Sequence, residues 1–463
     1  MTPRFGQPIQ DLSPAEAALP DARVLARRRD ARRILDAAIR AANPLQCLQR
    51  SVRLSADALV VEGEQFPLSP TARIRVVGAG KATAAMAQAV EGILGDRLES
   101  GAINTKYGHA LPLQRIHTTE CGHPIPDEAG VAGAELILGQ LQNLTDDDIV
   151  LCLFSGGGSA LLPAPAEGLS LTDKQQTTAR LLECGASIDE VNTIRKHLSA
   201  LKGGQLARHA MPARLVTLAI SDVIGDVADT IASGPTVADP TTFADCLRLL
   251  DHYQLRARVP AAVRQHLEDG EAGRLPDTPA AADELGDTRF HVVGNNALSL
   301  EAAREAARAC GYEPLVLSSR IAGETRDAAG VHVAIGQEIV STSQPIRAPA
   351  CIISGGETTV TLTATAGKGG RNQEFALAAA IDLQGQPQIT VLSAGTDGTD
   401  GPTDAAGAIA DAWTVERGRR AGLVADDHLM TNDAYPFFAA LDDLIMTGPT
   451  GTNVMDLRLV LVS

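Results

Sequence analysis

Two basic side chains lie where helices are expected to begin, a position that is unfavourable unless an anion is near. Lys81 follows Gly78-Ala79-Gly80, Arg371 follows Gly369-Gly370, and an Ala-rich stretch comes after each. The amino end of a helix is the positive end of its dipole, so an unpaired cation there is disfavoured. Phosphate or carboxylate binding is therefore the functional interpretation of both residues. A solvated side chain on a turn is the alternative, and for Arg371 taken alone it is preferred.

The glycines before Lys81 fit neither standard nucleotide-binding loop. Arg75 occupies the first Gly position of the P-loop spacing, and Thr83 occupies the third small position of the dinucleotide fingerprint. Glycines after a buried strand still allow the backbone to approach a phosphate at a helix start. We therefore predict that Gly78 and Gly80 contact a nucleotide.

Further loops after strand-like runs are rich in glycine. Three consecutive glycines usually reflect close approach by a ligand or unusual backbone angles, although a plain tight turn explains them about as well. We expect one such loop to hold the substrate, through Ser155, Gly156, Gly157, Gly158 and Ser159. We expect two others to contact the nucleotide, through Gly294, Asn295, Gly355, Gly356 and Glu357.

Carboxylates follow two other strand-like runs. Asp222 opens a loop that also contains Asp226, and Asp397 opens a loop with Asp400 and Asp404. A carboxylate at a strand end can bind Mg²⁺ or accept a hydroxyl proton, but Asp often makes a local turn instead. The second loop lacks the Glu that an EF-hand requires. Asp222 and Asp397 are thus candidates for both catalysis and metal binding, whereas His123 is expected to be structural.

These loops separate apolar runs from Ala/Leu-rich helical stretches all along the chain. This alternation predicts an α/β protein with largely parallel sheets, whose functional loops gather at the carboxyl ends of the strands. A hairpin is expected over 58–68, turning at Gly63. A length of 463 residues favours two domains. We place them at 1–260 and 289–463, with the Pro-rich and acidic segment 261–288 as their connection.

Composition limits the partners and the compartment. The formal net charge of -16 opposes binding to nucleic acid or anionic lipid. The seven cysteines contain no C-x-x-C pair, and no apolar run is long enough to span a membrane. The Arg-rich stretch 21–42 fits a first surface helix better than a transit peptide. We expect a cytoplasmic protein with a small-molecule substrate, and the sequence leaves a homo-oligomer open.

Taken together, the motifs resemble the class II glycerate kinases, whose C-terminal domain is called MOFRL. The stretches that carry the resemblance include VVGAGKA, HPIPDEAG, LFSGGGSALL, EVNTIRKHLSALKGGQLA, AISDVIGDVADTIASGPT, GKGGRNQEFALA, SAGTDGTDGPTDAAGA and TGPTGTNVMDL. The resemblance implies two distinct α/β domains, with a Rossmann-like, largely parallel sheet in the first and a smaller mixed sheet in the second. It also implies an active site in the cleft between them, ATP and Mg²⁺, and D-glycerate phosphorylated at its 2-hydroxyl.

By motif match, Lys81 and Arg371 take the phosphate-facing positions of that family, and Asp222 and Asp397 take its strand-end acids. An NAD(P)H-dependent hydroxypyruvate reductase is the first alternative, although the broken dinucleotide fingerprint opposes it. A non-catalytic sensor of sugar acids is the second, because fold alone does not establish catalysis.

Overall fold

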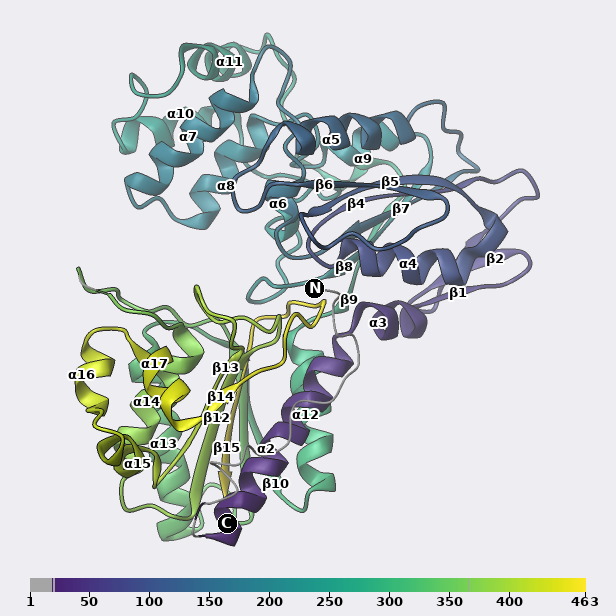
Figure 1. Cartoon of the computed structure of the whole chain (residues 1–463). Coiled ribbons are helices and arrows are strands. Elements are labelled where there is room, and N and C mark those ends of the chain that lie inside the picture. The colour runs from purple at the N-terminus through teal and green to yellow at the C-terminus, as the bar shows by residue number, and fades with distance from the viewer. Residues whose placement is uncertain (1–18, 20, 365) are drawn as a thin grey trace. The chain divides into compact units, whose positions relative to one another are not determined.

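The computed structural model describes residue 19, residues 21–364 and residues 366–463, and it divides the chain into two compact units. The continuous unit runs from Pro44 to Val293. The discontinuous unit combines the described residues up to Asn43 with Gly294–Ser463. In Figure 1 the purple helix α2 therefore lies among green and yellow C-terminal elements.

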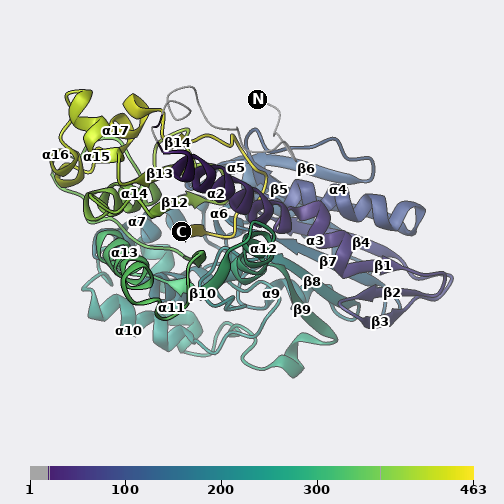
Figure 2. The ribbon, with the colours of Figure 1, turned by 90° about the horizontal axis from the view of Figure 1, so that it is seen from below.

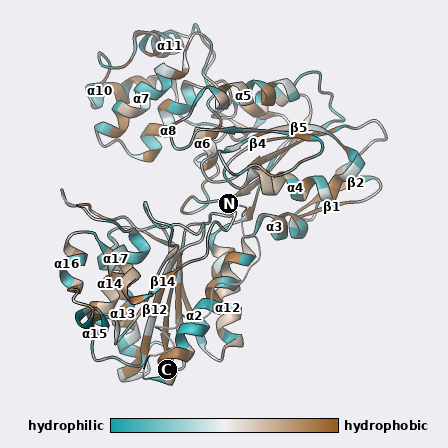
Figure 3. Cartoon of the chain, viewed as in Figure 1, coloured by the Kyte–Doolittle hydropathy of each residue, from teal (hydrophilic) through white to brown (hydrophobic). Residues whose placement is uncertain are grey.

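The continuous unit is built on a six-stranded sheet of order β6-β5-β4-β7-β8-β9. Its first five members in that order pair in parallel. The strands are β4 (Ile74–Ala79), β5 (Leu98–Lys106), β6 (Ile116–Cys121), β7 (Ile149–Phe154), β8 (Arg214–Ile220) and β9 (Thr288–Gly294). The predicted parallel sheet is confirmed. The inner strands β7 and β8 are almost continuously apolar, as strands covered on both faces must be (Figure 3).

Helices and a small antiparallel sheet complete this unit. The small sheet has the order β1-β2-β3 and includes the predicted hairpin, with Gly63 at a positive φ of 85° in its turn. Its strands are β1 (Val52–Leu54), β2 (Ala58–Val61) and β3 (Glu64–Pro67). The helices are α3 (Pro44–Ser51), α4 (Thr83–Leu94), η1 (Gly95–Arg97), α5 (Glu128–Gln140), α6 (Gly158–Leu161), α7 (Leu171–Glu183), α8 (Ile188–His197), α9 (Gln205–Ala210), η2 (Ile231–Ser233), α10 (Phe243–His252), α11 (Ala261–Glu271) and η3 (Ala282–Leu285).

The strand order reverses between β4 and β7. From β4 the chain adds β5 and then β6 on one side, and it returns to place β7 on the other side of β4. In open parallel sheets the crevice at such a reversal is the usual ligand site, at the carboxyl ends of the strands. The loops that follow β4 and β7 are those of Lys81 and of Ser155–Ser159, so the topology brings two predicted loops together.

The discontinuous unit has a mixed sheet of order β10-β11-β15-β12-β13-β14, as predicted. Only the β10–β11 pair is parallel. The strands are β10 (Glu313–Ile321), β11 (Ala350–Gly356), β12 (Ile389–Gly395), β13 (Gly407–Asp411), β14 (Leu444–Ile445) and β15 (Asp456–Val462). The helices are α2 (Ala22–Ala41), α12 (Asn296–Ala309), α13 (Thr325–Thr342), α14 (Arg371–Asp382), α15 (Thr414–Arg420), α16 (Ala425–Met430) and α17 (Ala434–Leu441).

Helix α2 belongs to this unit because its buried face completes the unit's core. It contacts α12 along its length, and the two helices lie side by side in Figures 1 and 2. Ile34 and Leu35 are fully buried against the sheet. The Arg28 guanidinium, also buried, pairs with Asp411 and Asp443 at 2.7 Å each. The stretch 21–42 is thus a helix, as expected, but it is a core helix rather than a surface one.

The observed division differs from the predicted boundaries at both ends of the continuous unit. The described residues before Pro44 belong with the C-terminal part, and 261–288 is folded into the continuous unit. The reason lies in α11, where Val263 and Leu267 are fully buried against α7, α8 and α10. Proline and acidic residues concealed this helix, since Pro260 is only its N-terminal cap. No helix among the described residues is long and apolar enough to cross a membrane.

Candidate active site

The loops after β4 and β7 are hydrogen-bonded to each other at the reversal of strand order. The Lys81 amide donates to the Gly156 carbonyl at 2.9 Å, and the Ala82 amide donates to the Ser155 hydroxyl at 3.0 Å. The ring nitrogen Nδ1 of His109 lies 3.1 Å from the Lys81 carbonyl oxygen. The main chain of Lys81 is therefore fixed from two sides, at the start of α4.

The side chain of Lys81 has no such partners. Among the residues that the structure describes, it forms neither a hydrogen bond nor an ion pair. It lies against the Gly-rich loop, because a Cβ added to Gly157 would be 3.3 Å from Lys81 Cε and 2.8 Å from the His123 ring. Gly157 itself has a φ of 82°, which L side chains rarely adopt. An ammonium group is thus presented beside a loop that has no room for another side chain.

His123 contributes no positive charge to this cluster at neutral pH. Burial lowers its pKa to about 4, and the nearby charges of Lys81, Lys106 and His109 act in the same direction. Burial also lowers the pKa of His109. The positive potential beside Gly157 therefore comes from Lys81 and Lys106, while the two imidazoles are mainly neutral. His123 was expected to be structural, and its contact with Gly157 is a packing role beside the candidate site.

The loops after β4 and β7 differ in whether their backbone amides are free to bind a ligand. The Gly80 amide donates to Asn104, and those of Lys81 and Ala82 donate to the β7 loop. In the described part of the chain, the amides of Gly156 and Gly157 have no partner. Free amides can bind an anion. They therefore favour the predicted substrate role of the Ser155–Ser159 loop.

Packing accounts for the predicted nucleotide-binding glycines Gly78 and Gly80. A Cβ at Gly78 would lie 2.1 Å from the Leu153 carbonyl oxygen, and one at Gly80 would lie 2.1 Å from Ser155 Oγ. Both glycines let β4 approach β7 closely. Their contact with a nucleotide stays a prediction.

Asp222 lies in the loop that directly follows β8, next in the sheet to β7. Because parallel neighbours end at the same edge, this loop and the Ser155–Ser159 loop emerge together. Ser221 makes a local turn with the amide of Val223, and Asp226 has a positive φ of 57°. The described residues contain no group of three His, Cys, Asp or Glu side chains that could hold a metal ion.

Arg371 is firmly paired in the discontinuous unit. It opens α14, and its guanidinium binds the buried Asp456 carboxylate through Nε at 2.8 Å and Nη2 at 3.0 Å. Its Nη1 lies 2.8 Å from the half-exposed Glu357. Burial alone would lower the pKa of Arg371, but these carboxylates raise it. The guanidinium is thus partly exposed but paired, and a phosphate would have to share or replace the contact to Glu357.

Asp397 and Asp400, in the loop that follows β12, have different environments. Asp397 accepts hydrogen bonds from the amide and hydroxyl of Thr399 in a local turn. Asp400 is buried and accepts the amide hydrogens of Asn372 and Gln373 at the start of α14. Burial raises the pKa of Asp400 to about 6, against the opposing effect of these amides. Asp400 therefore caps the helix that carries Arg371, whereas Asp397 is partly exposed to solvent.

The remaining predicted nucleotide contacts have structural partners. Asn295 caps α12 by accepting the Leu298 amide, and Gly294 ends β9. A Cβ at Gly355 would lie 1.8 Å from Asn296 Oδ1, and Gly356 has a φ of 101°. These roles explain the residue types, and nucleotide binding by these five residues, Glu357 included, stays a prediction.

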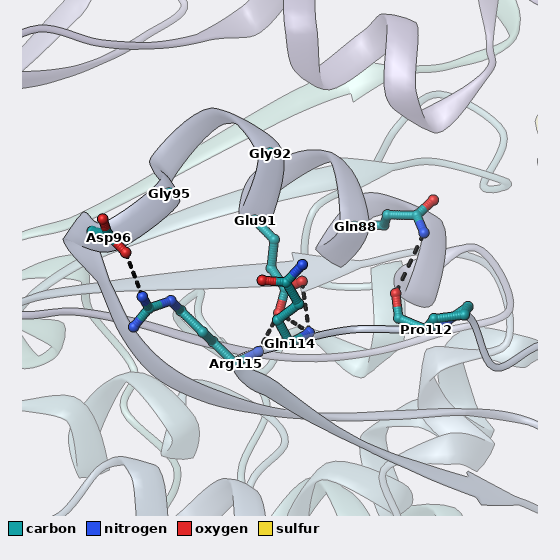
Figure 4. A pocket seen from close by; sticks show the side chains of 8 residues that line it. All are labelled: Gln88, Glu91, Gly92, Gly95, Asp96, Pro112, Gln114 and Arg115. Atoms are coloured by element: carbon teal, nitrogen blue, oxygen red, sulfur yellow. Dashed lines mark hydrogen bonds and ion pairs between the residues drawn. The ribbon is translucent and has the colours of Figure 1, made fainter.

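A pocket in the continuous unit lies at the amino ends of the strands, opposite the loops that follow β4 and β7 (Figure 4). It is lined by Gln88, Glu91, Gly92, Gly95, Asp96, Pro112, Gln114 and Arg115. These residues precede β5 and β6 or end α4, so they lie at the amino ends of the strands. Its charged groups are occupied: Glu91 accepts the Gln114 and Arg115 amides, and Arg115 pairs with Asp96. The pocket offers no free chemistry and is not the candidate site.

Sequence reasoning missed several polar residues around these loops. Lys202 is buried and donates to the carbonyls of Ser159 and Leu162, at 2.8 Å each. Asn192 accepts from Ser233, which lies 2.7 Å from Ser159. Asp456 anchors Arg371. Each lies inside a family-like stretch, but a lysine or aspartate within a helical or strand-like run carries no signal of its partner.

Comparison with known proteins agrees with this architecture. Residues 30–268 match a domain of unknown function, DUF4147, and residues 350–456 match the MOFRL family. A glycerate 2-kinase of Pyrococcus horikoshii is 41% identical over 93% of this chain and 96% of its own. An Agrobacterium vitis protein, provisionally named a hydroxypyruvate reductase, is 45% identical over 93% of each chain. The crystal structure of a Thermotoga maritima glycerate kinase superposes with a TM-score of 0.84, at 36% identity, covering 95% of this chain and 99% of that one.

Proposed function

The chain belongs to the glycerate 2-kinase family that combines DUF4147 and MOFRL domains, and we propose that it transfers the terminal phosphate of ATP to the 2-hydroxyl of D-glycerate. Relatives named glycerate 2-kinase or D-glycerate 2-kinase support the acceptor and the position. The nucleotide follows from the reaction class, because a kinase requires a phosphoryl donor.

One structural observation supports phosphoryl transfer independently of family membership. The ammonium group of Lys81 lacks a protein partner in the described residues, and it lies beside free amides at the reversal of strand order. Phosphoryl transfer depends mainly on positioning and on neutralising charge, rather than on a protein nucleophile. Such a site fits that requirement better than it fits hydride transfer.

The residues divide the task as follows. The Ser155–Ser159 loop holds glycerate, and Lys81 neutralises charge on the transferred phosphoryl group. Arg371 is the second phosphate-facing cation of the family pattern, and the guanidinium edge that faces Glu357 is the one available to a phosphate. Asp222 orients or deprotonates the attacking hydroxyl, and Asp397 supports metal or ligand.

Mg²⁺ is compatible with these residues. The described residues form no cage of three or more acidic or imidazole ligands. Mg²⁺ beside a nucleotide does not need one, because it takes one or two carboxylates and completes its shell with phosphate oxygens and water. When bound, it would neutralise phosphate charge, and Asp222 and Asp397 are the carboxylates that would hold it.

A coupled assay with ATP, Mg²⁺ and D-glycerate tests the proposal. ADP formation should require D-glycerate, and phosphorus NMR of the product should show 2-phosphoglycerate. Formation of 3-phosphoglycerate would correct only the position. ATP consumption that is independent of glycerate, or absent, would overturn the kinase and leave the sensor interpretation.

The name of the Agrobacterium relative makes hydroxypyruvate reduction the second candidate. The same preparation should be incubated with NADH or NADPH and hydroxypyruvate, following absorbance at 340 nm. The loop after β4 opposes this activity, since its amides are occupied by Asn104 and by the β7 loop and cannot bind a pyrophosphate. Oxidation of the reduced nucleotide would reverse this conclusion.

A further inference from the structure

A second group of basic side chains lies near the end of the Ser155–Ser159 loop at Ser159, whereas Lys81 lies against Gly157. Lys202 is bound to the Ser159 carbonyl, and Lys174 donates to the carbonyls of Ala164 and Leu198. Arg195, on α8, is close enough that its charge contributes to lowering the pKa of both lysines, after the larger effect of burial. Three basic side chains are therefore close together, and burial disfavours the charged form of both lysines by lowering the pKa of each.

This group has no counter-ion in the part of the chain that is described. Both lysines bind only carbonyl oxygens, and Arg195 forms no hydrogen bond or ion pair with any described residue. Burial also lowers the pKa of Arg195. The adjacent Lys196 shows the ordinary arrangement, because its ammonium lies 3.2 Å from Asp229 and 3.3 Å from Asp239. Arg195 is partly buried, and a partly desolvated guanidinium without an acid is costly unless an anion binds it.

Neutral polar groups connect Arg195 to the Gly-rich loop. Asn192 lies one turn before Arg195 on α8, so the two side chains share a face of the helix. Asn192 Oδ1 accepts from Ser233 Oγ at 3.2 Å, and the hydroxyls of Ser233 and Ser159 are 2.7 Å apart. The region thus offers a guanidinium, an amide and two hydroxyls, a set that suits a carboxylate.

We propose that Arg195, with Asn192 and the Ser159–Ser233 hydroxyl pair, forms the subsite for the carboxylate of the substrate. This inference rests on the proposed function, and it names the part of the acceptor that the site recognises. Lys202 is a positioning residue, since it holds the carbonyl of Ser159. The planar fork of Arg195 matches a carboxylate at two points, whereas Lys81, which lies against Gly157, is left for the phosphoryl group.

Steady-state kinetics of Arg195→Met and Arg195→Lys in the full chain test the subsite. The Met variant should raise the KM for D-glycerate about 10²-fold and leave the KM for ATP unchanged, because a charge-assisted contact to the acceptor alone is lost. The Lys variant should fall between it and the wild type. Arg180→Ala is the control, since Arg180 is half-exposed on α7 and pairs only with Glu183. An unchanged KM for glycerate, or a KM for ATP that rises equally, would overturn the subsite.

Calorimetry separates failure of the subsite from failure of the kinase. D-Glycerate and hydroxypyruvate should each bind the wild-type protein and bind Arg195→Met at least about 10²-fold more weakly. Loss of binding in the variant, together with a wild-type protein that consumes no ATP, upholds the subsite and overturns only the kinase. Equal binding to both proteins, or no binding to either, overturns the subsite. The thermal midpoints of both Arg195 variants show whether folding is intact.

Discussion

Asp456 holds the guanidinium of Arg371 at two points, with Nε–Oδ2 and Nη2–Oδ1 distances of 2.8 and 3.0 Å. The same fully buried carboxylate accepts hydrogen bonds from Asn372 and Arg458. Glu357, at the other end of the guanidinium, is 41% exposed. The orientation of Arg371 is therefore set by one core carboxylate, while its outer edge meets an acid that solvent can replace.

Replacing these two acids should have very different effects on stability. Asp456→Ala removes the carboxylate partner of the buried Arg458, which keeps only neutral acceptors, and it leaves one edge of Arg371 unpaired. The free energy of unfolding should therefore fall by about 3–5 kcal/mol. Glu357→Gln should change it by less than about 1 kcal/mol, because this pair is open to solvent. Urea unfolding measures both. Equal losses would contradict the central role of Asp456.

Lys81→Met should lower turnover by about 10³-fold and hardly change the thermal midpoint. The side chain contacts no partner that folding requires among the described residues, so its loss acts on the bound phosphoryl group. Arg115→Ala is the matched control, because Arg115 lies at the opposite edge of the same sheet and pairs with Asp96. Near-normal turnover of Lys81→Met would remove Lys81 from the mechanism.

His197 should make stability depend on alkaline pH. Both of its ring nitrogens face acceptors, the Thr193 carbonyl at 2.8 Å and Asp277 at 2.9 Å, so the imidazolium form satisfies both. Burial lowers the pKa of His197, but Asp277 and its other partners raise it to about 10. The contribution is complete below pH 6.5, the pKa in the unfolded chain, and is lost as pH rises toward 10.

Unfolding by urea at pH 6 and pH 9.5 measures this loss. Between pH 6 and pH 9.5 the wild type should lose more stability than His197→Gln, because the glutamine at position 197 does not titrate. His252→Gln, at an exposed position of α10, should retain the wild-type dependence. The same slope in the wild type and His197→Gln would contradict the assignment.

The attachment of α2 should depend on Arg28. Arg28→Ala removes the buried positive charge that pairs with the Asp411 and Asp443 carboxylates. The free energy of unfolding should therefore fall by about 3–5 kcal/mol. Arg33→Ala, on the same helix but 73% exposed, should cost less than about 1 kcal/mol. Chemical unfolding of the two variants compares them directly. A small loss for Arg28→Ala would mean that apolar contacts alone hold α2.

Sequence patterns predicted the elements better than they predicted the units. The hairpin predicted over 58–68 is found as β2 and β3 with its turn at Gly63, because a glycine turn between two short apolar runs has a strong local signal. The division was missed because it depends on contacts across the whole sequence. Arg28, for example, pairs with Asp411 and Asp443, some 400 residues away.

For the site, local chemistry predicted the unusual position of Lys81 but not its surroundings. The argument from the helix dipole is consistent with Lys81, whose ammonium forms no ion pair with a described residue, and its role in anion binding stays a prediction. The same argument at Arg371 overlooked Asp456, which arrives from β15. Arg195 was overlooked because a basic residue in an amphipathic helix usually faces solvent and pairs with an acid, whereas Arg195 is partly buried and has no such partner among the described residues.

During synthesis, α2 leaves the ribosome long before the strands that cover its apolar face. Its residues emerge early, but β11, β12 and β15, which bury Ile34 and Leu35, follow only after the roughly 250 residues of the continuous unit. At about 5–20 residues per second, that wait is on the order of 12–50 s or longer. The continuous unit can complete its own core meanwhile, whereas the apolar face of α2 stays uncovered until the last strands are made. Nascent chains stalled before β15 should therefore expose α2 to proteases or chaperones while the continuous unit is already protected.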